Sequence, residues 1–381
     1  MNTTTKYCDL ARFQKNYEEL HGPLSIIVCV LGSIANILNI CVLSRKEMRC
    51  STNLILTGLA VADLLVMIEY IPFSYHGYFD LEKRKYANYF TYNWAIFMIF
   101  HATFSLLFHF VSCCLTVILA LWRYLTIKNP PITKFWCDLR KTLLVIIFTY
   151  LLCPLICFPL YLSYQVLPLN RTTDVNEKLI NVESNETKIH YSTIYVVQYV
   201  NEFYSILVFW LYTVIIKLVP CVLLTVLSTK LVLVLLETKK RKNRLLQNRL
   251  PLNNLQSDSK PMINHKVKKD KQADRTSGML VAVLLLFLIT EFPQAILGLL
   301  SATLKSSFHS QCYIPLGDLL DILALTNSGI NFILYCTMSR QFRQTFYEFF
   351  KLKYLMKFNP LPEHHGHEKT GEKVTQITAH V

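Results

Sequence analysis

Seven apolar segments, each long enough to cross a bilayer, constrain the fold of this chain more than any other feature. A membrane-spanning helix needs about 20 predominantly apolar residues. Only 17% of the 381 residues are charged and 52% are hydrophobic, whereas a soluble protein of this length usually carries more charge. We therefore expect an all-α fold, a bundle of seven transmembrane helices, with spans near 24–45, 53–76, 93–122, 141–164, 203–236, 278–301 and 315–338.

The distribution of Lys and Arg predicts which loops face the cytoplasm, where these residues are enriched. The 237–275 loop holds twelve of them, whereas the 165–202 loop holds three against five acidic residues. We therefore expect the first loop inside, the second outside, the N-terminus extracellular and the C-terminus cytoplasmic. The same pattern accounts for the net charge of +14, so nucleic acid is not an expected partner. N-glycosylation sequons fall on the predicted outer face, at Asn2, Asn170 and Asn185.

Four parts follow from this topology. Phe342, Phe346, Phe349 and Phe350 share one helical face after the last span, which favours an amphipathic helix on the inner membrane surface. In the outer 165–202 loop, the stretch from Ile189 to Val197 favours a β-hairpin lid. The expected parts are an extracellular tail (1–23), the membrane domain (24–338, with the basic cytoplasmic loop 237–275), the amphipathic helix (339–351) and a cytoplasmic tail (352–381).

Cysteine usage predicts one covalent link at the outer face. Of the twelve cysteines, only Cys8 and Cys312 are expected to face the oxidising exterior. A disulfide between them would tie the N-terminal tail to the mouth of the seventh span. The other cysteines lie inside or at the ends of spans, where a cysteine usually acts as a small buried hydrophobic residue.

Ionisable residues inside the spans are the strongest candidates for function, because such a charge costs about 2.5–3.5 kcal/mol on insertion scales. Either a receptor or a proton-coupled transporter would use them, the latter through a relay of Asp63, His109, Lys217 and Glu291. An odd number of spans, no internal repeat and few glycines count against the transporter. Catalysis is not expected, since the sequence shows no metal-ligand cluster, nucleophile elbow or phosphate-binding loop.

Several motifs give the chain a family resemblance. Leu59-Ala60-Val61-Ala62-Asp63-Leu64 in the second span, Arg123-Tyr124 closing the third, Pro220 and Pro293 resemble rhodopsin-like G protein-coupled receptors. More narrowly, the chain resembles the myosuppressin and FMRFamide-like peptide receptors of invertebrates in strings that occur in the same order. These strings are Thr290-Glu291-Phe292-Pro293-Gln294, Cys312-Tyr313-Ile314-Pro315-Leu316-Gly317-Asp318 and Asn331-Phe332-Ile333-Leu334-Tyr335-Cys336.

This resemblance implies a receptor for an extracellular amidated neuropeptide that activates a heterotrimeric G protein. Peptides of this type end in Arg-Phe-amide, so the site needs an anion for the guanidinium and a slot for the aromatic ring. We expect the anion to be Glu69, Asp318 or Asp321. A related ligand class, myoinhibitory or sex-peptide-like, is the alternative. The candidate ligand-binding residues are the three acids, the aromatic Tyr70, Phe104 and Phe292, and His101, His109 and Glu291.

The resemblance also implies a polar cluster beneath the ligand site. It is either a plain hydrogen-bonded core or a sodium site, and it comprises Asp63, Ser112, Asn327 and Asn331. At its upper edge, Glu291 is expected either to pair with Lys217 or to be neutral, because burial disfavours the ionised form of a carboxyl group.

At the inner face, the resemblance assigns G-protein coupling and activation to Arg123, Tyr124, Pro293, Asn331 and Tyr335. The chain departs from the broad receptor pattern at several of these places. Trp122 stands where an acid usually precedes the Arg, and Met98 stands where a disulfide-forming Cys is usual. We therefore expect a weakly restrained resting state, in which Asp274 is the candidate partner of Arg123.

Overall fold

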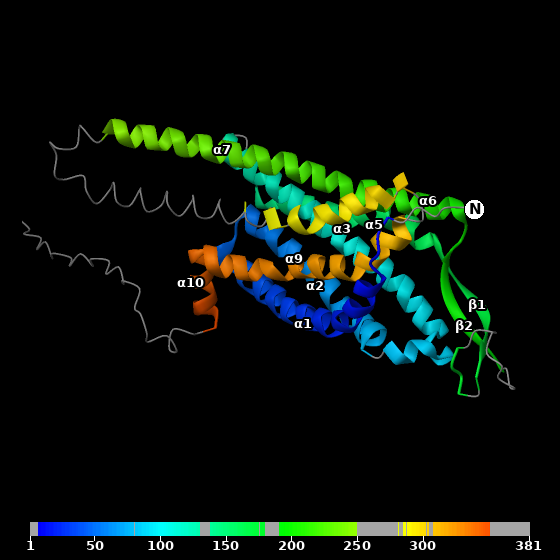
Figure 1. Ribbon diagram of the computed structural model, residues 1–381. Coiled ribbons are helices and arrows are strands. Elements are labelled where there is room, and N and C mark those ends of the chain that lie inside the picture. Colours follow the sequence, from blue (N-terminus) through cyan, green and yellow to red (C-terminus); the bar gives the residue numbers. More distant parts are fainter. Residues whose placement is uncertain are drawn as a thin grey trace, which may run out of the picture.

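The computed structural model describes residues 7–79, 81–129, 138–174, 176–179, 190–249, 281, 285–286, 288–301, 303–304 and 308–350. Within these residues, six helices are long and apolar enough to cross a membrane, and Leu288–Ser301 is a shorter apolar helix. The helices form an elongated bundle (Figure 1). They are α1 (Ala11–Leu43), α2 (Ser51–Tyr78), α3 (Tyr92–Lys128), α5 (Leu139–Leu162), α6 (Glu202–Trp210), α7 (Val219–Arg249), α9 (Ile314–Met338) and α10 (Arg340–Phe349).

Short helical segments of other types join these elements. A π-helix, η4 (Leu211–Leu218), connects α6 directly to α7, and a second one, η7 (His309–Tyr313), leads into α9. Turns of 3-10 helix lie between the longer helices, as η1 (Lys46–Met48), η2 (Leu81–Lys85) and η3 (Ala87–Tyr89). The two π-helices both lie in the half of the bundle that holds the candidate site.

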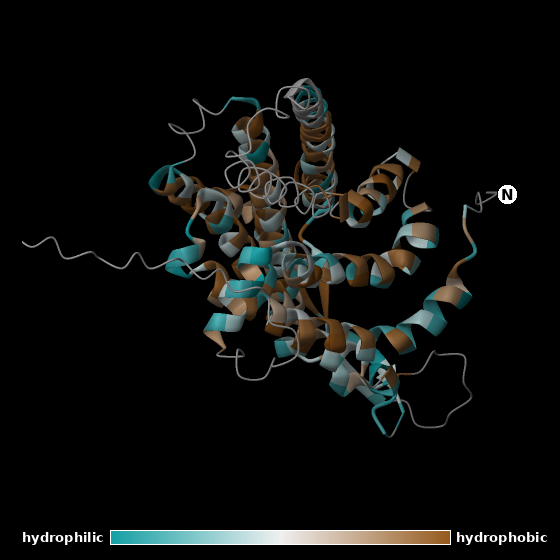
Figure 2. Cartoon of the chain, turned by 90° about the vertical axis from the view of Figure 1, so that its left-hand side faces the viewer, coloured by the Kyte–Doolittle hydropathy of each residue, from teal (hydrophilic) through white to brown (hydrophobic). Residues whose placement is uncertain are grey.

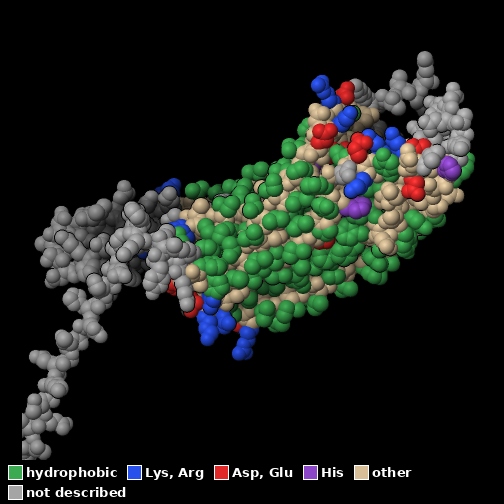
Figure 3. Space-filling model, turned by 90° about the horizontal axis from the view of Figure 1, so that it is seen from below, with side chains coloured by type: hydrophobic (Ala, Val, Ile, Leu, Met, Phe, Trp, Pro, Cys, Tyr) green, Lys and Arg blue, Asp and Glu red, His purple; other side chains and the backbone are tan. Residues whose placement is uncertain are grey.

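Large apolar side chains cover the sides of the bundle. Leu31, Leu155 and Ile289 are 62%, 72% and 66% exposed, which is the pattern of a surface that meets lipid rather than water. Charged side chains gather toward the two ends of the visible face, and a broad hydrophobic band lies between them (Figure 3). The helical ribbons are predominantly hydrophobic, as seen along the bundle (Figure 2).

The first helix begins at Ala11, well before the expected span at 24. Its added turns are helical because they pack against α2: His21 is fully buried and its Nε2 lies 3.0 Å from the Tyr70 hydroxyl. Part of the expected extracellular tail is therefore an extension of the first helix. The middle of the basic 237–275 loop, from 250 onward, and the 352–381 tail lie outside the described residues.

Gly32 of α1 leaves room for the Met67 side chain of α2, at a point where α1 also contacts Gly329 of α9. A Cβ built on Gly32 would lie 2.4 Å from Cε of Met67 and 3.4 Å from Cα of Gly329. Beside it, the Asn36 amide donates to the Ser328 carbonyl oxygen at 3.0 Å. Small residues of this kind let transmembrane helices approach closely enough for such interhelical hydrogen bonds.

A two-stranded antiparallel hairpin lies at one end of the bundle (Figure 1). Strand β1 (Tyr164–Thr173) pairs with β2 (His190–Tyr199), in register from Tyr164–Tyr199 to Thr173–His190. Backbone hydrogen bonds of 2.8–2.9 Å connect this hairpin and its turn to the loop between α2 and α3: Leu179 N–H to Lys85 O, Ala87 N–H to Glu177 O, and Tyr195 N–H to Phe90 O. They hold the hairpin against the loop that leads into α3.

The N-terminal segment is fixed at the same end. Cys8 and Cys312, the pair expected at the outer face, form a disulfide with a Cα–Cα distance of 5.5 Å. The Tyr7 backbone N–H also donates to Oε1 of Gln311 at 2.8 Å. The disulfide connects the start of the chain to η7, just before α9.

Helix α10 closes the opposite end of the bundle. Ser339 caps its N-terminus by accepting from the Phe342 N–H at 3.2 Å, and Phe342 is 1% exposed against the end of α9. Nη1 of Arg343 donates to the carbonyl oxygens of Cys336 and Thr337, both at 2.9 Å. These bonds satisfy the last carbonyls of α9, which have no partner within their own helix.

Substituting Gly32 by Val should destabilise the helix bundle by about 1–3 kcal/mol, because overpacking a tight contact forces neighbouring atoms to move. We expect a lower midpoint of thermal unfolding for the detergent-purified protein. Gly317→Val is the matched control, since a Cβ at Gly317 meets nothing within 4 Å. An equal effect of the two substitutions would contradict the tight contact at Gly32.

Candidate functional site

A cavity of about 320 Å³ lies between the helices in the half of the bundle nearer the hairpin. It is enclosed by α2, α3, the hairpin, α6, η4, the Leu288–Ser301 helix, η7 and α9. Its walls carry aromatic rings and a small number of polar and charged groups, the usual composition of a ligand site. Its lining residues include Tyr70, His101, His109, Tyr164, Tyr199, Phe209, Tyr212, Lys217, Gln294, Tyr313 and Asp321.

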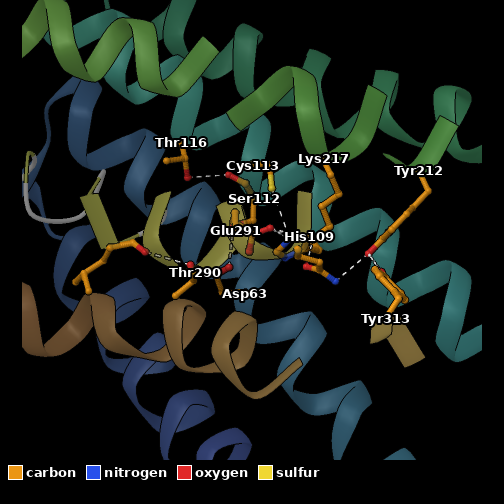
Figure 4. Close-up of polar contacts among 12 residues, drawn as sticks. Asp63, His109, Ser112, Cys113, Thr116, Tyr212, Lys217, Thr290, Glu291 and Tyr313 are labelled. Carbon is orange, nitrogen blue, oxygen red and sulfur yellow. Dashed lines mark hydrogen bonds and ion pairs between the residues drawn. The ribbon is translucent and has the colours of Figure 1, made fainter. Parts of the chain in front are cut away.

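A buried ion pair lies at the floor of this cavity, where Lys217 lines the cavity and its partner Glu291, a candidate ligand-binding residue, does not. Nζ of Lys217 lies 2.9 Å from Oε2 of Glu291, and the two side chains are 4% and 1% exposed. The ammonium also lies 2.8 Å from His109 Nε2 and donates to Oε1 of Gln294 at 2.7 Å. His109 in turn lies 3.0 Å from the same Glu291 oxygen. Lys217 therefore contacts three different partners from α3 and the Leu288–Ser301 helix. Figure 4 shows it beside two of them, His109 and Glu291.

The position of Lys217 follows from the π-helix that carries it. π-helical turns inside α-helices change the direction of the side chains around them and are frequent at functional sites. Lys217 and Thr213 of η4 are both buried within the bundle, although Ile215 on the same segment is 41% exposed. The charge thus reaches a partner inside the bundle, as it must where lipid surrounds the helix.

The same group of residues has some donors of a metal site. His109, Cys113 and Glu291 offer ligand atoms that all lie within 4.8 Å of one another. However, the Lys217 ammonium already occupies the space next to the His109 nitrogen and the Glu291 oxygen. A metal ion there would face a cation at contact distance, so the geometry fits an ammonium centre rather than a metal centre.

Hydrogen bonds extend from this floor to the seventh helix. Gln294 Nε2 donates to the Tyr212 hydroxyl at 2.8 Å, and that hydroxyl lies 3.3 Å from the hydroxyl of Tyr313. Tyr212, Gln294 and Tyr313 belong to η4, the Leu288–Ser301 helix and η7. One continuous polar network therefore joins three helices along the cavity wall.

The three candidate acids lie in different surroundings. Asp321 lines the cavity, and its contact with the Tyr70 hydroxyl is long, at 3.3 Å. Asp318 accepts from the Tyr78 hydroxyl at 2.7 Å and does not line the cavity. Glu69 is 7% exposed, lies behind the cavity wall, and its Oε1 is 2.8 Å from His101 Nδ1. Asp321 is therefore the carboxylate that faces the cavity with accepting capacity left.

The aromatic candidates are also separated by the structure. Tyr70 lines the cavity, but Phe104 and Phe292 do not. Phe104 packs between Phe100 and Phe108 along α3, and Phe292 is 41% exposed. Five further Tyr and Phe side chains line the cavity, from the hairpin and the fifth and seventh helices: Tyr164, Tyr199, Phe209, Tyr212 and Tyr313.

The polar cluster lies deeper in the bundle. Ser112 Oγ donates to one oxygen of Asp63 at 2.9 Å (Figure 4). Asn331 Nδ2 donates to the other oxygen at 3.4 Å. The Ser328 side chain is a further hydrogen-bonding neighbour of Asp63, at the position next to the expected Asn327. The donor set is compatible with a hydrogen-bonded core, and an ion there stays a prediction.

At the inner end of α3, Arg123 is held without an acid. Its Nε is buried with no hydrogen-bond partner, and no described acidic residue forms an ion pair with it. Trp122 points toward α5, where its Nε1 donates to Thr142 at 3.3 Å. The Tyr335 hydroxyl is also buried and unpartnered. Asp274, the expected partner of Arg123, lies outside the described residues.

Comparison with known protein families identifies this arrangement. Residues 23–353 match the family model of the serpentine type seven-transmembrane G protein-coupled chemoreceptors, Srw. The chain belongs to this receptor family. The bundle is thus a seven-transmembrane receptor fold, and the short Leu288–Ser301 helix is the described part of its sixth span. The chain is a multi-pass membrane protein, and the members of its family are signalling receptors.

Curated relatives cover most of the receptor. The G-protein coupled receptor dmsr-1 of Caenorhabditis elegans is 33% identical over 88% of this chain and 68% of its own length. The sex peptide receptor of Drosophila melanogaster is 26% identical over 87% of this chain and 72% of its own. The human thyrotropin-releasing hormone receptor is 27% identical over 87% of this chain and 77% of its own. Peptide receptors are therefore well represented among the similar proteins.

Removing one member of the buried pair should lower the stability of the folded receptor far more than removing both members. Lys217→Met leaves the Glu291 carboxylate buried beside an apolar chain, a loss of about 3–5 kcal/mol. We expect little Lys217→Met receptor at the cell surface, measured by antibody labelling of an outer epitope tag. Adding Glu291→Gln should restore surface expression, because no uncompensated charge remains. Equal expression of the single and double variants would contradict a structural ion pair.

Proposed function

We propose that the receptor binds an extracellular amidated neuropeptide of the FMRFamide-like, myosuppressin-like type and couples this binding to a heterotrimeric G protein. The observation that carries the proposal is Asp321, a carboxylate that faces an aromatic-lined cavity and accepts only a long hydrogen bond from Tyr70 among its described contacts. The orientation that the proposal requires, with the hairpin end outside, agrees with the Lys and Arg distribution.

The guanidinium of a peptide arginine would bind Asp321. An ionised carboxylate offers about four lone-pair sites, and two of them match the planar fork of arginine. Tyr70, which touches Asp321, is itself fixed by His21 at 3.0 Å. The carboxylate is thus oriented before the ligand arrives, so that little ordering is required on binding.

The C-terminal aromatic ring would lie among the tyrosine and phenylalanine side chains of the cavity. Tyr164 and Tyr199 stack on each other at the base of the hairpin, with ring centroids 5.1 Å apart, and both line the cavity. Phe209, Tyr212 and Tyr313 supply the facing wall. Aromatic pairs of this kind prefer offset or edge contacts, which such a wall allows.

The floor of the cavity supports the preference for an amide over a free acid. Lys217 and Glu291 neutralise each other, and Gln294 supplies a neutral polar group beside them. A terminal amide can accept and donate hydrogen bonds there without adding charge. A terminal carboxylate would add a negative charge where the Lys217 ammonium is already paired with Glu291 and where the surrounding dielectric constant is low.

A related peptide class is the second candidate. The sex peptide receptor of Drosophila melanogaster is among the similar proteins at 26% identity, and a sex-peptide-like or myoinhibitory ligand would enter the same cavity. The two classes differ in whether the ligand presents an arginine to Asp321. The proton-coupled transporter has less support, because its relay residues Lys217, His109 and Glu291 are bonded to one another rather than arranged along a path.

The experiment is a calcium readout in cells that express the receptor with a promiscuous G protein. The panel contains amidated Arg-Phe peptides, each paired with its free acid and its Arg→Ala form. We expect a nanomolar response that both changes abolish. A response that survives Arg→Ala would favour the related peptide class, and silence across the panel at confirmed surface expression would contradict the proposed ligand.

Asp321→Asn should weaken the response to the amidated Arg-Phe peptides by about 10- to 100-fold, because a hydrogen bond to a charged group contributes about 1.5–3 kcal/mol. The response to the Arg→Ala peptide should be the same for Asp321→Asn as for the wild-type receptor. Asp318→Asn is the matched control, since Asp318 lies on the same helix, accepts a hydrogen bond from Tyr78 and does not line the cavity. Equal losses for the two variants would exclude Asp321 as the arginine partner.

The absence of an acid beside Arg123 should raise signalling without ligand. Trp122→Asp would place a carboxylate next to the Arg123 guanidinium, whose Nε has no hydrogen-bond partner, and stabilise the resting arrangement. We expect lower basal G-protein activation than wild type at equal surface expression, measured by nucleotide exchange on membranes. Trp122→Phe, which removes only the bond to Thr142, is the control and should leave basal activity unchanged. Unchanged basal activity in Trp122→Asp would overturn the idea.

A further inference from the structure

A second cavity, of about 390 Å³, lies between the ends of α2 and α3 that meet the hairpin. Its walls come from α2, η2, η3, α3 and β2. Most of the lining is aromatic or aliphatic, and its main residues are Phe73, Tyr78, Tyr89, Trp94, Met98 and Val196. Met98 stands where a cysteine is usual in related receptors, so the side chain that replaces the disulfide forms part of the wall.

One aromatic pair separates this outer cavity from the main one. The Phe73 ring stacks on the His101 ring, with centroids 3.6 Å apart and planes 9° from parallel. Phe73 lines the outer cavity and His101 lines the main cavity. On α3, Met98 is one helical turn from His101. The two cavities therefore follow each other along the bundle and share a wall.

The outer cavity suits a neutral side chain. Among the described residues that line it, Arg84 alone carries a charge. That guanidinium is already engaged, because it contacts the Glu18 carboxylate and the Gly77 carbonyl and lies 4.9 Å from the centre of the Tyr78 ring. A charged ligand group would find no free counter-ion, whereas an apolar ring would find aromatic surfaces around it.

We propose that the outer cavity is a second subsite of the receptor, which binds an aromatic or long aliphatic side chain of the peptide. The inference rests on the proposed function and extends it. From Ser105, on the main cavity, to Met98 is about 10 Å along α3 at about 1.5 Å per residue. An extended peptide spans this distance in about three residues. The peptide residue that binds in the outer cavity would therefore lie about three positions before the residue that binds in the main cavity.

The test fills the cavity from two opposite walls, with Met98→Trp on α3 and Val196→Trp on β2. Met98→Leu is the control, because it conserves volume. Each receptor is challenged with three amidated Arg-Phe peptides. The long peptide has an aromatic residue three positions before the residue that binds in the main cavity. The second peptide has Ala in place of this aromatic residue, and the third, truncated peptide begins directly after it. The calcium readout gives the concentration for half-maximal response.

For wild type and Met98→Leu, we expect the upstream aromatic residue to improve potency roughly tenfold, the scale of burying one such ring. Both filled variants should respond to the long peptide as wild type responds to the Ala form. They should leave the truncated peptide unchanged. Equal loss of potency for long and truncated peptides, or an undiminished effect of the ring in both filled variants, would overturn the second subsite.

A binding measurement separates this inference from the proposed ligand. Saturation-transfer NMR with N-acetylphenylalaninamide on the purified receptor should show a signal in wild type and Asp321→Asn that both filled variants reduce. If no Arg-Phe-amide peptide activates wild type but this signal behaves as expected, the proposed ligand fails and the outer site stands. A signal that neither filled variant changes would overturn the site even if the peptides activate the receptor.

Discussion

The buried pair of Lys217 and Glu291 is the interaction on which the rest of the site depends. Each charge alone would be costly in a bundle surrounded by lipid, and their contact of 2.9 Å offsets part of that cost. Because Lys217 also reaches His109 and Gln294, the pair fixes α3, η4 and the sixth span relative to one another. It thereby sets the depth of the main cavity and leaves its floor polar but electrically neutral.

The sequence predicted those features that a lipid environment dictates and failed where only packing decides. Apolar length predicted the spans, and the outer location of Cys8 and Cys312 predicted their pairing. The sequence placed Phe104 and Phe292 in the ligand site, and the structure places both outside the cavity. Sequence could not decide this, because the lipid-facing and the inward faces of a membrane helix are both apolar. The π-helix at Leu211–Leu218 has no clear sequence signal either, yet it determines which residues of the fifth span face inward.

Two departures from the broad receptor pattern are matched by local contacts. Without a disulfide at position 98, the hairpin is held over the bundle by backbone hydrogen bonds that involve Lys85, Ala87 and Phe90. The resulting space beside Met98 is part of the outer cavity. At the opposite end, the missing acid beside Arg123 has no such replacement among the described residues, since Trp122 is directed to Thr142 on α5. In the proposed function, the first departure shapes the outer cavity and the second weakens the restraint of the resting state.

The proposed signalling path requires that the ligand favour one arrangement of the bundle over another, since only differential affinity shifts such an equilibrium. Glu291 and Gln294 lie on either side of Pro293, where the sixth helix can bend. Both side chains bond to Lys217, and Gln294 continues through Tyr212 to Tyr313 on the seventh helix. A peptide that binds Asp321 and reaches this network would change the contacts on both sides of the bend. Ligand contact at the floor would therefore alter the position of the sixth helix without a separate relay of charges.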